Sequence, residues 1–211
     1  MAIRAVIFDL GGVVLGSPLH AIAAYERERG IAPGSVNRVV ADTGAAGAWG
    51  RLERGMIGVA AFVPMFEAEC AEAGFAIDAR VMMERIGVES QPRPAMLAAI
   101  RSLRARGLRV AALTNNWLSE ERADGTGALR DLFDAFFESS VLGLQKPDPR
   151  IYQHACRALA IEPDEAVFLD DIGRNLKAAR ALGMATIKVD TPDQALAELA
   201  SLLDIPAFPS G

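Results

Sequence analysis

Four polar clusters contain the residues whose types could do chemistry, and each lies at or soon after the end of a predicted strand. A carboxylate begins the first cluster, a hydroxyl the second and a lysine the third, while two adjacent acids begin the fourth. The clusters are Asp9 with Gly11-Gly12, Thr114-Asn115-Asn116, Lys146-Pro147-Asp148, and Asp170-Asp171 with Asn175. Each cluster alone has a plain structural interpretation, as a turn, a surface loop or a helix cap. Their coincidence at strand ends is therefore the main functional signal.

These residue types suit transfer of an anionic group. A carboxylate nucleophile such as Asp9 needs a metal beside it that shields it from an anionic substrate. Magnesium prefers hard oxygen ligands and is usually held by one or two carboxylates, which Asp9 and Asp171 would supply. A hydroxyl and backbone amides at Thr114 and Asn115 are suited to bind the oxygens of the transferred group. Lys146 would balance the charge of the carboxylates.

The elements that must position these clusters alternate between strand and helix. Short apolar runs predict strands at residues 3–8, 109–113, 135–138, 166–169 and 185–189, and their lack of clean alternation suits strands that are covered on both faces. Helical patterns lie between them, at residues 94–106, 149–160 and 175–182. This order predicts an α/β fold, a doubly wound parallel sheet with right-handed crossovers. Ligands bind such sheets at the carboxyl ends of the strands.

A long helical segment follows the first predicted strand. Residues 17–90 are rich in Ala and Glu, have helical spacing and contain no convincing strand. We expect them to form a small helical cap domain inserted into an α/β catalytic core of residues 1–16 and 91–211. Gly11-Gly12 and Gln91-Pro92-Arg93-Pro94 resemble the two linkers.

Composition narrows the class of protein. The 211 residues are 51% hydrophobic, which is enough for one substantial core with a small appended domain. The net charge of −5 argues against a nucleic-acid partner. Cys70 and Cys156 show no metal-ligand spacing and are expected to be reduced thiols, as in a cytoplasmic protein. No stretch has the length of a signal peptide core or a membrane span, so no membrane partner is expected. The oligomeric state is left open.

The clusters resemble the four motifs of the haloacid dehalogenase (HAD) superfamily, whose members are mostly phosphatases. The match spans nearly the whole chain, in the strings Phe8-Asp9-Leu10-Gly11-Gly12-Val13, Leu113-Thr114-Asn115, Lys146-Pro147-Asp148 and Phe168-Leu169-Asp170-Asp171 with Asn175. Leu-Thr-Asn-Asn-Trp and Asp-Asp-Ile-Gly-Arg-Asn-Leu-Lys are more specific. They are similar to the group around the amino-terminal phosphatase domain of soluble epoxide hydrolase.

The resemblance implies a HAD-like Rossmannoid core with a cap, and a hydrolase that dephosphorylates a small phosphorylated metabolite. By resemblance, Asp9 attacks phosphorus and forms an aspartyl-phosphate, and Mg²⁺ is bound by Asp9, Asp171 and the backbone carbonyl of Gly11. Thr114 and Asn115 hold phosphoryl oxygens. Lys146 links nucleophile and phosphate. By the same resemblance, Asp170 and Asn175 would lie next to these residues and hold them in position without contacting the substrate.

One position departs from the family's pattern. Phosphatases of this family usually carry a second Asp two residues after the nucleophile, as general acid and base, but here that residue is Gly11. Such a group is typically worth about 10²–10⁴-fold in rate. Either the enzyme is slow or uses a leaving group, such as an acyl phosphate, that needs no proton, or another residue supplies the proton. Candidates for that role are Glu53, Arg51 and His20.

Two other functions stay open. Dehalogenating and phosphonate-cleaving relatives also lack this Asp, because a halide leaving group needs no acid. A binding protein with a degenerate site is the remaining alternative. Substrate specificity is expected to depend on the cap, with Arg51 and Trp117 as candidate residues.

Overall fold

The computed structural model describes residues 2–117 and 129–208. Within these residues, five parallel strands form one sheet in the order β3-β2-β1-β4-β5. Their bounds are β1 (Ala5–Phe8), β2 (Arg109–Thr114), β3 (Ala135–Glu138), β4 (Ala166–Asp170) and β5 (Ala185–Lys188). The chain winds outward from β1 on one side and then returns to β1's other side at β4. The predicted doubly wound parallel sheet is confirmed, and its strand order reverses beside β1, where such folds bind ligands.

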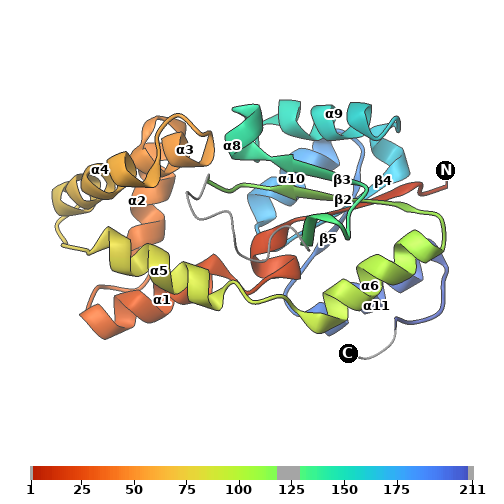
Figure 1. Ribbon diagram of the computed structural model, residues 1–211, viewed down its shortest axis with the longest axis horizontal. Coiled ribbons are helices and arrows are strands. Elements are labelled where there is room, and N and C mark those ends of the chain that lie inside the picture. Colours follow the sequence, from red (N-terminus) through yellow and green to blue (C-terminus); the bar gives the residue numbers. More distant parts are fainter. Residues whose placement is uncertain (1, 118–128, 209–211) are drawn as a thin grey trace.

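Both faces of the sheet are covered, as the sequence pattern indicates. Successive residues of β1 alternate between two cores, with Val6 and Phe8 in one and Ala5 and Ile7 in the other. The first core packs against α6 (Pro94–Ala105) and α11 (Pro192–Leu203), and the second against α9 (Pro149–Ala158) and α10 (Gly173–Ala181) (Figure 1). A strand between two helical layers has no polar face, which explains the absence of alternation.

The segment between β1 and β2 is helical and packs around its own core. Its helices are α1 (Pro18–Arg29), α2 (Ser35–Thr43), α3 (Ala48–Glu53), α4 (Val59–Glu72) and α5 (Ala79–Glu89). Tyr25, Phe62 and Phe66 are fully buried in this third cluster, to which Trp117 adds from the sheet side. In Figure 1 these helices lie to one side of the sheet. We refer to residues 17–90 as the inserted segment.

The chain enters and leaves the inserted segment through two neighbouring stretches of backbone, at residues 14–16 and 91–93. The Gly16 N–H donates to the Gln91 carbonyl at 3.0 Å, and the Arg93 N–H donates to the Val14 carbonyl at 2.9 Å. A Cβ at Gly16 would lie 1.8 Å from the Glu89 carbonyl oxygen, so only glycine fits there. The first crossing therefore lies at Leu15 and Gly16, not at Gly11-Gly12 as the sequence suggested.

Two smaller features concern the cysteines and the apolar character of the helices. Cys70 and Cys156 are both buried and form no disulfide. No helix in the described ranges combines the length and the apolar character that a membrane crossing needs.

Candidate active site

Asp9 follows the last residue of β1 and lies at the carboxyl end of the sheet. Its backbone N–H donates to the Leu169 carbonyl at 2.9 Å, and its Oδ1 accepts from the Leu10 N–H at 2.7 Å. Because Phe8 pairs with Leu169 in the register of β1 and β4, the next residues, Asp9 and Asp170, lie side by side. Two carboxylates are thus brought together by the sheet alone.

The loop after Asp9 is shaped by Gly12. This residue has a φ of +80°, and a Cβ there would lie 2.1 Å from Oδ2 of Asp171. Only glycine satisfies both the conformation and the space. The Arg93 side chain donates to the Gly12 carbonyl at 2.9 Å, so the second linker to the inserted segment also steadies this loop.

Lys146 joins the clusters that are distant in sequence. Its Nζ lies 2.8 Å from Asp9 Oδ2 and 2.7 Å from Asp170 Oδ2, and its side chain is 1% exposed. The Asn115 side chain forms two hydrogen bonds with the Lys146 backbone: it accepts from the N–H at 2.8 Å and donates to the carbonyl at 3.1 Å. Asn175 donates to both oxygens of Asp170 at 3.1 Å. Motifs from four strand ends therefore share one hydrogen-bonded site.

Three carboxylates in this site could hold a cation. Asp9, Asp170 and Asp171 each offer an oxygen, and these atoms lie within 4.8 Å of one another. With Lys146 as the neighbouring cation, three ionised carboxylates leave two uncompensated negative charges. Asp171 Oδ1 is buried and has no hydrogen-bond partner among the described residues. A hard divalent cation fits both this charge and this open oxygen.

The electrostatics of the site follow from its burial. Loss of solvent raises the pKa of Asp9 well above its ordinary value, although the Lys146 charge opposes the shift. Burial, followed by the charge of Asp170, raises the pKa of Asp171 to about 6. Burial alone would lower the pKa of Lys146, but the charges of Asp170 and Asp9 raise it. Lys146 is therefore the protonated member, and further positive charge beside the carboxylates would favour their ionised forms.

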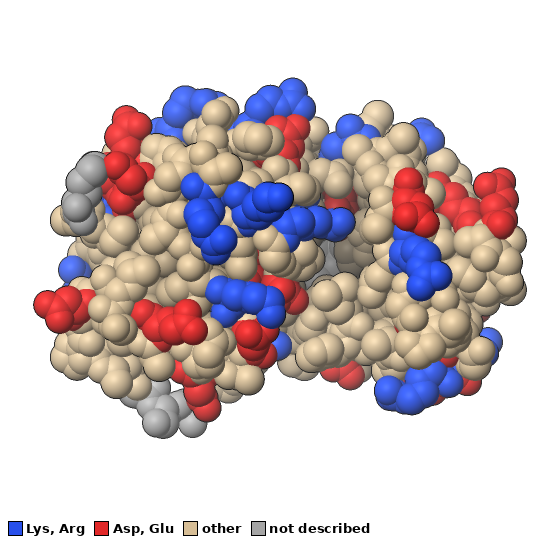
Figure 2. Space-filling model, turned by 180° about the vertical axis from the view of Figure 1, so that it is seen from behind, with Lys and Arg blue, Asp and Glu red and all other residues tan. Residues whose placement is uncertain are grey.

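A cavity of about 800 Å³ opens above the carboxylates, between the sheet and the inserted segment. Asp9, Lys146 and Asp171 lie at its sheet side, whereas α1, α2 and α3 contribute apolar residues such as Ile22 and Val40. Figure 2 shows a hollow between the two parts of the molecule, with several Lys and Arg side chains on the larger part beside it. The site can thus enclose a small molecule with an anionic end and an apolar end.

The remaining residues singled out from the sequence fall in different places. Gly11 and Trp117 line the cavity. Thr114 is 3% exposed, does not line the cavity, and its hydroxyl donates to the Asn115 carbonyl at 3.3 Å. Arg51 does not line the cavity, and neither does the exposed His20.

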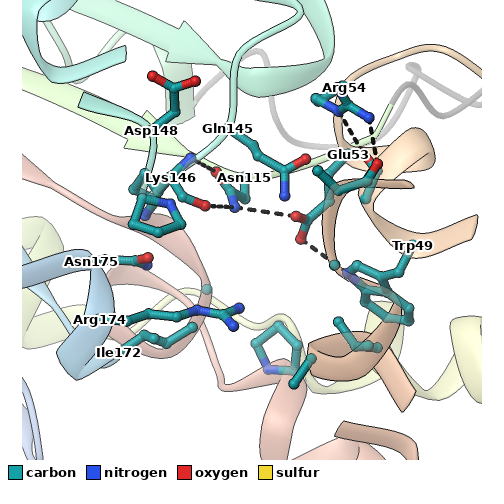
Figure 3. A pocket seen from close by; sticks show the side chains of 18 of the residues that line it. Trp49, Glu53, Arg54, Asn115, Gln145, Lys146, Asp148, Ile172, Arg174 and Asn175 are labelled. Atoms are coloured by element: carbon teal, nitrogen blue, oxygen red, sulfur yellow. Dashed lines mark hydrogen bonds between the residues drawn. The ribbon is translucent and has the colours of Figure 1, made fainter. Parts of the chain in front are cut away.

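Several lining residues were not singled out from the sequence. Arg174, at the start of α10, reaches into the cavity, and Gln145, in the loop before Lys146, lines it from the opposite side (Figure 3). Arg54 of the inserted segment donates to the carbonyls of Gly50 and Ala45. Arg174 directly precedes Asn175 and Gln145 directly precedes Lys146, which was the signal for them, whereas nothing in the sequence marked Arg54.

Comparison with known proteins agrees with this geometry. The family model described as haloacid dehalogenase-like hydrolase matches residues 3–183. The chain is 38% identical to acyl-CoA dehydrogenase family member 10 of Mus musculus, over 96% of this chain and 19% of that protein. It is 36% identical to bifunctional epoxide hydrolase 2 of Sus scrofa, over 99% of this chain and 41% of that protein. The chain therefore spans less than half of either relative.

Solved structures share the fold. A HAD-family enzyme from Bacteroides thetaiotaomicron, in complex with magnesium and inorganic phosphate, has a TM-score of 0.63 at 20% identity, over 89% of this chain and 94% of that one. A structure of a dehalogenase with an intermediate complex has a TM-score of 0.65 at 22% identity, over 96% and 97% of the two chains. From its sequence match and its fold, the chain belongs to the haloacid dehalogenase-like hydrolases.

Proposed function

We propose that this hydrolase is a magnesium-dependent phosphatase that acts on a small phosphorylated metabolite through an aspartyl-phosphate at Asp9. The observation that carries the proposal is the set of Asp9, Asp170 and Asp171 around the buried Lys146, at the sheet side of the cavity, which Asp9, Lys146 and Asp171 line. Relatives named as phosphatases support it, among them one from Mycobacterium tuberculosis that is 38% identical over 54% of this chain.

Magnesium fits the donor set. Asp9, Asp171 and the backbone carbonyl of Gly11 would hold the ion, and the open Oδ1 of Asp171 is the strongest local support. Bound there, magnesium would neutralise charge on the phosphoryl oxygens. Asp170 and Asn175 would hold the site residues in position without binding the ion, because Asp170 is wholly buried and accepts hydrogen bonds from both Lys146 and Asn175.

The protein's own groups then perform the displacement. An Asp9 carboxylate oxygen attacks phosphorus while the bond to the leaving oxygen breaks, and water later attacks the aspartyl-phosphate and frees Asp9. Lys146 holds Asp9 in place and offers positive charge to the transferring group. We also propose that Thr114 and Asn115 bind phosphoryl oxygens; the buried Thr114 hydroxyl, which donates to the Asn115 carbonyl and does not line the cavity, would have to turn toward the substrate. Since both polar atoms of the Asn115 side chain already hold the Lys146 backbone, its contribution would come from its backbone N–H.

The inserted segment serves as the cap in this proposal, with residues 1–16 and 91–211 as the catalytic core. The separate apolar cluster of the segment and its two hydrogen-bonded linkers support this division. The cap would exclude water and contact the organic part of the substrate, with Trp117 among the residues that set specificity. Arg51, the other candidate from the sequence, would act there only if it turned toward the cavity.

Dehalogenation is the second candidate, because Gly11 offers no side chain to protonate an alkoxide. Purified protein should be assayed on phosphate esters, acyl phosphates and 2-haloacids, with magnesium and with a chelator. Phosphate release that requires both magnesium and Asp9 is the expected result. Halide release that survives chelation would favour dehalogenation over the phosphatase proposal. No activity on any substrate would favour a degenerate binding site. Undiminished phosphate release by Asp9→Asn would also overturn it.

A further inference from the structure

Glu53 is the one cavity-lining carboxylate that the inserted segment contributes among the described residues. It lies at the end of α3, with its Oε1 accepting from Trp49 Nε1 at 3.0 Å and its Oε2 accepting from Asn115 Nδ2 at 3.1 Å. Figure 3 shows the carboxylate between these two donors at the edge of the cavity. Unlike Asp148, which pairs with Arg150, it forms no ion pair within the described part of the chain. It is therefore held in place without being neutralised.

The position of Glu53 suits the half of the reaction that Asp9 leaves open. In an in-line displacement the leaving oxygen departs on the side of phosphorus opposite the attacking oxygen. Asp9 attacks from the sheet, so the leaving oxygen points toward the inserted segment, from which Glu53 comes. Asn115 ties the two ends together, because its side chain donates both to Glu53 and to the carbonyl of Lys146, whose Nζ contacts Asp9.

The surroundings of Glu53 favour a proton that can be given and taken back. Burial raises the pKa of Glu53, while the hydrogen bond from Trp49, the charges of Lys146 and Arg174 and the hydrogen bond from Asn115 hold the rise in check. A raised pKa keeps the proton on this carboxyl group to a higher pH than usual, which suits a group that must donate it and take it back. Neither of its hydrogen-bond partners is a proposed metal ligand.

We propose that Glu53 is the general acid and base that the chain uses in place of a side chain at position 11. The inference rests on the proposed phosphatase function. In the first step the Asp9 oxygen bonds to phosphorus, the bond to the leaving oxygen breaks, and that oxygen takes the Glu53 proton to give an alcohol. In the second step Glu53 takes a proton from the attacking water, the Asp9–phosphorus bond breaks, and phosphate and the Asp9 carboxylate are released.

The test compares leaving groups in the first step. A p-nitrophenolate ion leaves without a proton, whereas an alkoxide must be protonated, so Glu53→Gln should act on the two esters unequally. With magnesium, rapid quenching should show a first step about 10²–10⁴-fold slower on an alkyl phosphate, and changed less than about 10-fold on p-nitrophenyl phosphate. An equal loss on both esters would mean that Glu53 only positions Asn115 and Lys146. No loss on either would remove Glu53 from the reaction.

Glu26→Gln is the matched control. Glu26 is another buried glutamate of the inserted segment, accepts hydrogen bonds from the backbone N–H groups of Gly34 and Val36, and does not line the cavity. Its substitution should leave the ratio between the two esters unchanged. The same selective loss in Glu26→Gln would attribute the effect to the fold of the segment and overturn the proposal.

A second variant guards against misfolding. Added formate should accelerate Glu53→Ala on the alkyl phosphate and have little effect on the p-nitrophenyl ester, because a small acid can replace the missing carboxyl group. Formate rescue of both esters, or of neither, would contradict a proton-transfer role. Failure of the phosphatase function itself has a different signature: wild-type protein would release phosphate from neither ester, and both proposals would be rejected together.

Discussion

Asp171→Asn should stabilise the metal-free protein, although it removes a proposed magnesium ligand. Burial and the neighbouring charge of Asp170 raise the pKa of Asp171 from 3.8 to about 6. The folded protein therefore binds more protons than the unfolded chain between about pH 4 and pH 6, and its stability falls as the pH rises through this window. Above pH 6 the ionised carboxylate carries its full cost.

The size of this cost follows from the shift. Two pKa units correspond to about 3 kcal/mol at most, and because Asp171 is partly exposed, solvent screening reduces the figure to about 1–2 kcal/mol. An asparagine resembles the protonated acid, so in chelator at pH 7.5 the variant should be more stable by that amount. At pH 4 the gain should vanish, because Asp171 is then protonated in the wild type.

Magnesium should reverse the order of stability, so that the wild type becomes more stable than Asp171→Asn. A ligand at 100 times its dissociation constant stabilises the folded state by about 2.7 kcal/mol, and only the wild type would retain tight binding. Urea denaturation at pH 4 and pH 7.5, in chelator and in magnesium, measures all these free energies. The exposed Asp42→Asn is the control and should change none of them. Asp171 would not carry this charge cost if Asp171→Asn were no more stable than wild type in chelator at pH 7.5, and it would not be a magnesium ligand if magnesium stabilised both proteins equally.

Three further substitutions test the site. Gly12→Ala forces a residue with a φ of +80° to place a Cβ 2.1 Å from the Asp171 carboxylate, so calorimetry should show loss of magnesium binding; wild-type affinity would contradict this. Lys146→Met leaves two buried carboxylates unpaired and should cost about 3–5 kcal/mol in metal-free urea denaturation, whereas a cost below about 1 kcal/mol would argue against the buried ion pairs. Gly11→Asp, whose Cβ meets only Pro18 side-chain atoms at 3.1 Å, should restore alkyl phosphate turnover to Glu53→Gln. In the wild-type background, Gly11→Asp should change the rate of alkyl phosphate turnover little. If the Gly11→Asp, Glu53→Gln double variant stays slow, the step lost in Glu53→Gln is not proton transfer.

The floor of the site could be predicted from the sequence because parallel strands constrain it. Once Asp9 and Asp170 each follow an apolar strand of a parallel sheet, their side chains must meet at its carboxyl edge. The lysine loop alone would be interpreted as a surface loop, and it was identifiable only through its coincidence with the other three clusters and its resemblance to a family motif. Its attachment through Asn115 joins residues 31 positions apart, and no local pattern could reveal it.

The cavity wall from the inserted segment could not be predicted in the same way. Helical periodicity puts Trp49 and Glu53 on one face of α3 and turns Arg51 to another. Which of these faces meets the cavity depends on how α3 packs against its neighbours, including the edge-on contact of Trp49 with Trp117 at 6.0 Å between ring centroids. The sequence therefore offered Glu53, Arg51 and His20 as equal candidates, and only tertiary packing, which brings Glu53 alone of the three to the cavity, separates them.

The central claim is that phosphate passes through Asp9, and covalent labelling tests it most directly. The protein should be mixed with magnesium and a phosphate ester labelled at phosphorus, quenched within the first turnover, and digested for peptide mass analysis. A transient phosphoryl group should appear on Asp9 and be absent in chelator and in Asp9→Asn. Phosphate release by the wild type with no label on Asp9 at any time, or label on another residue, would contradict it.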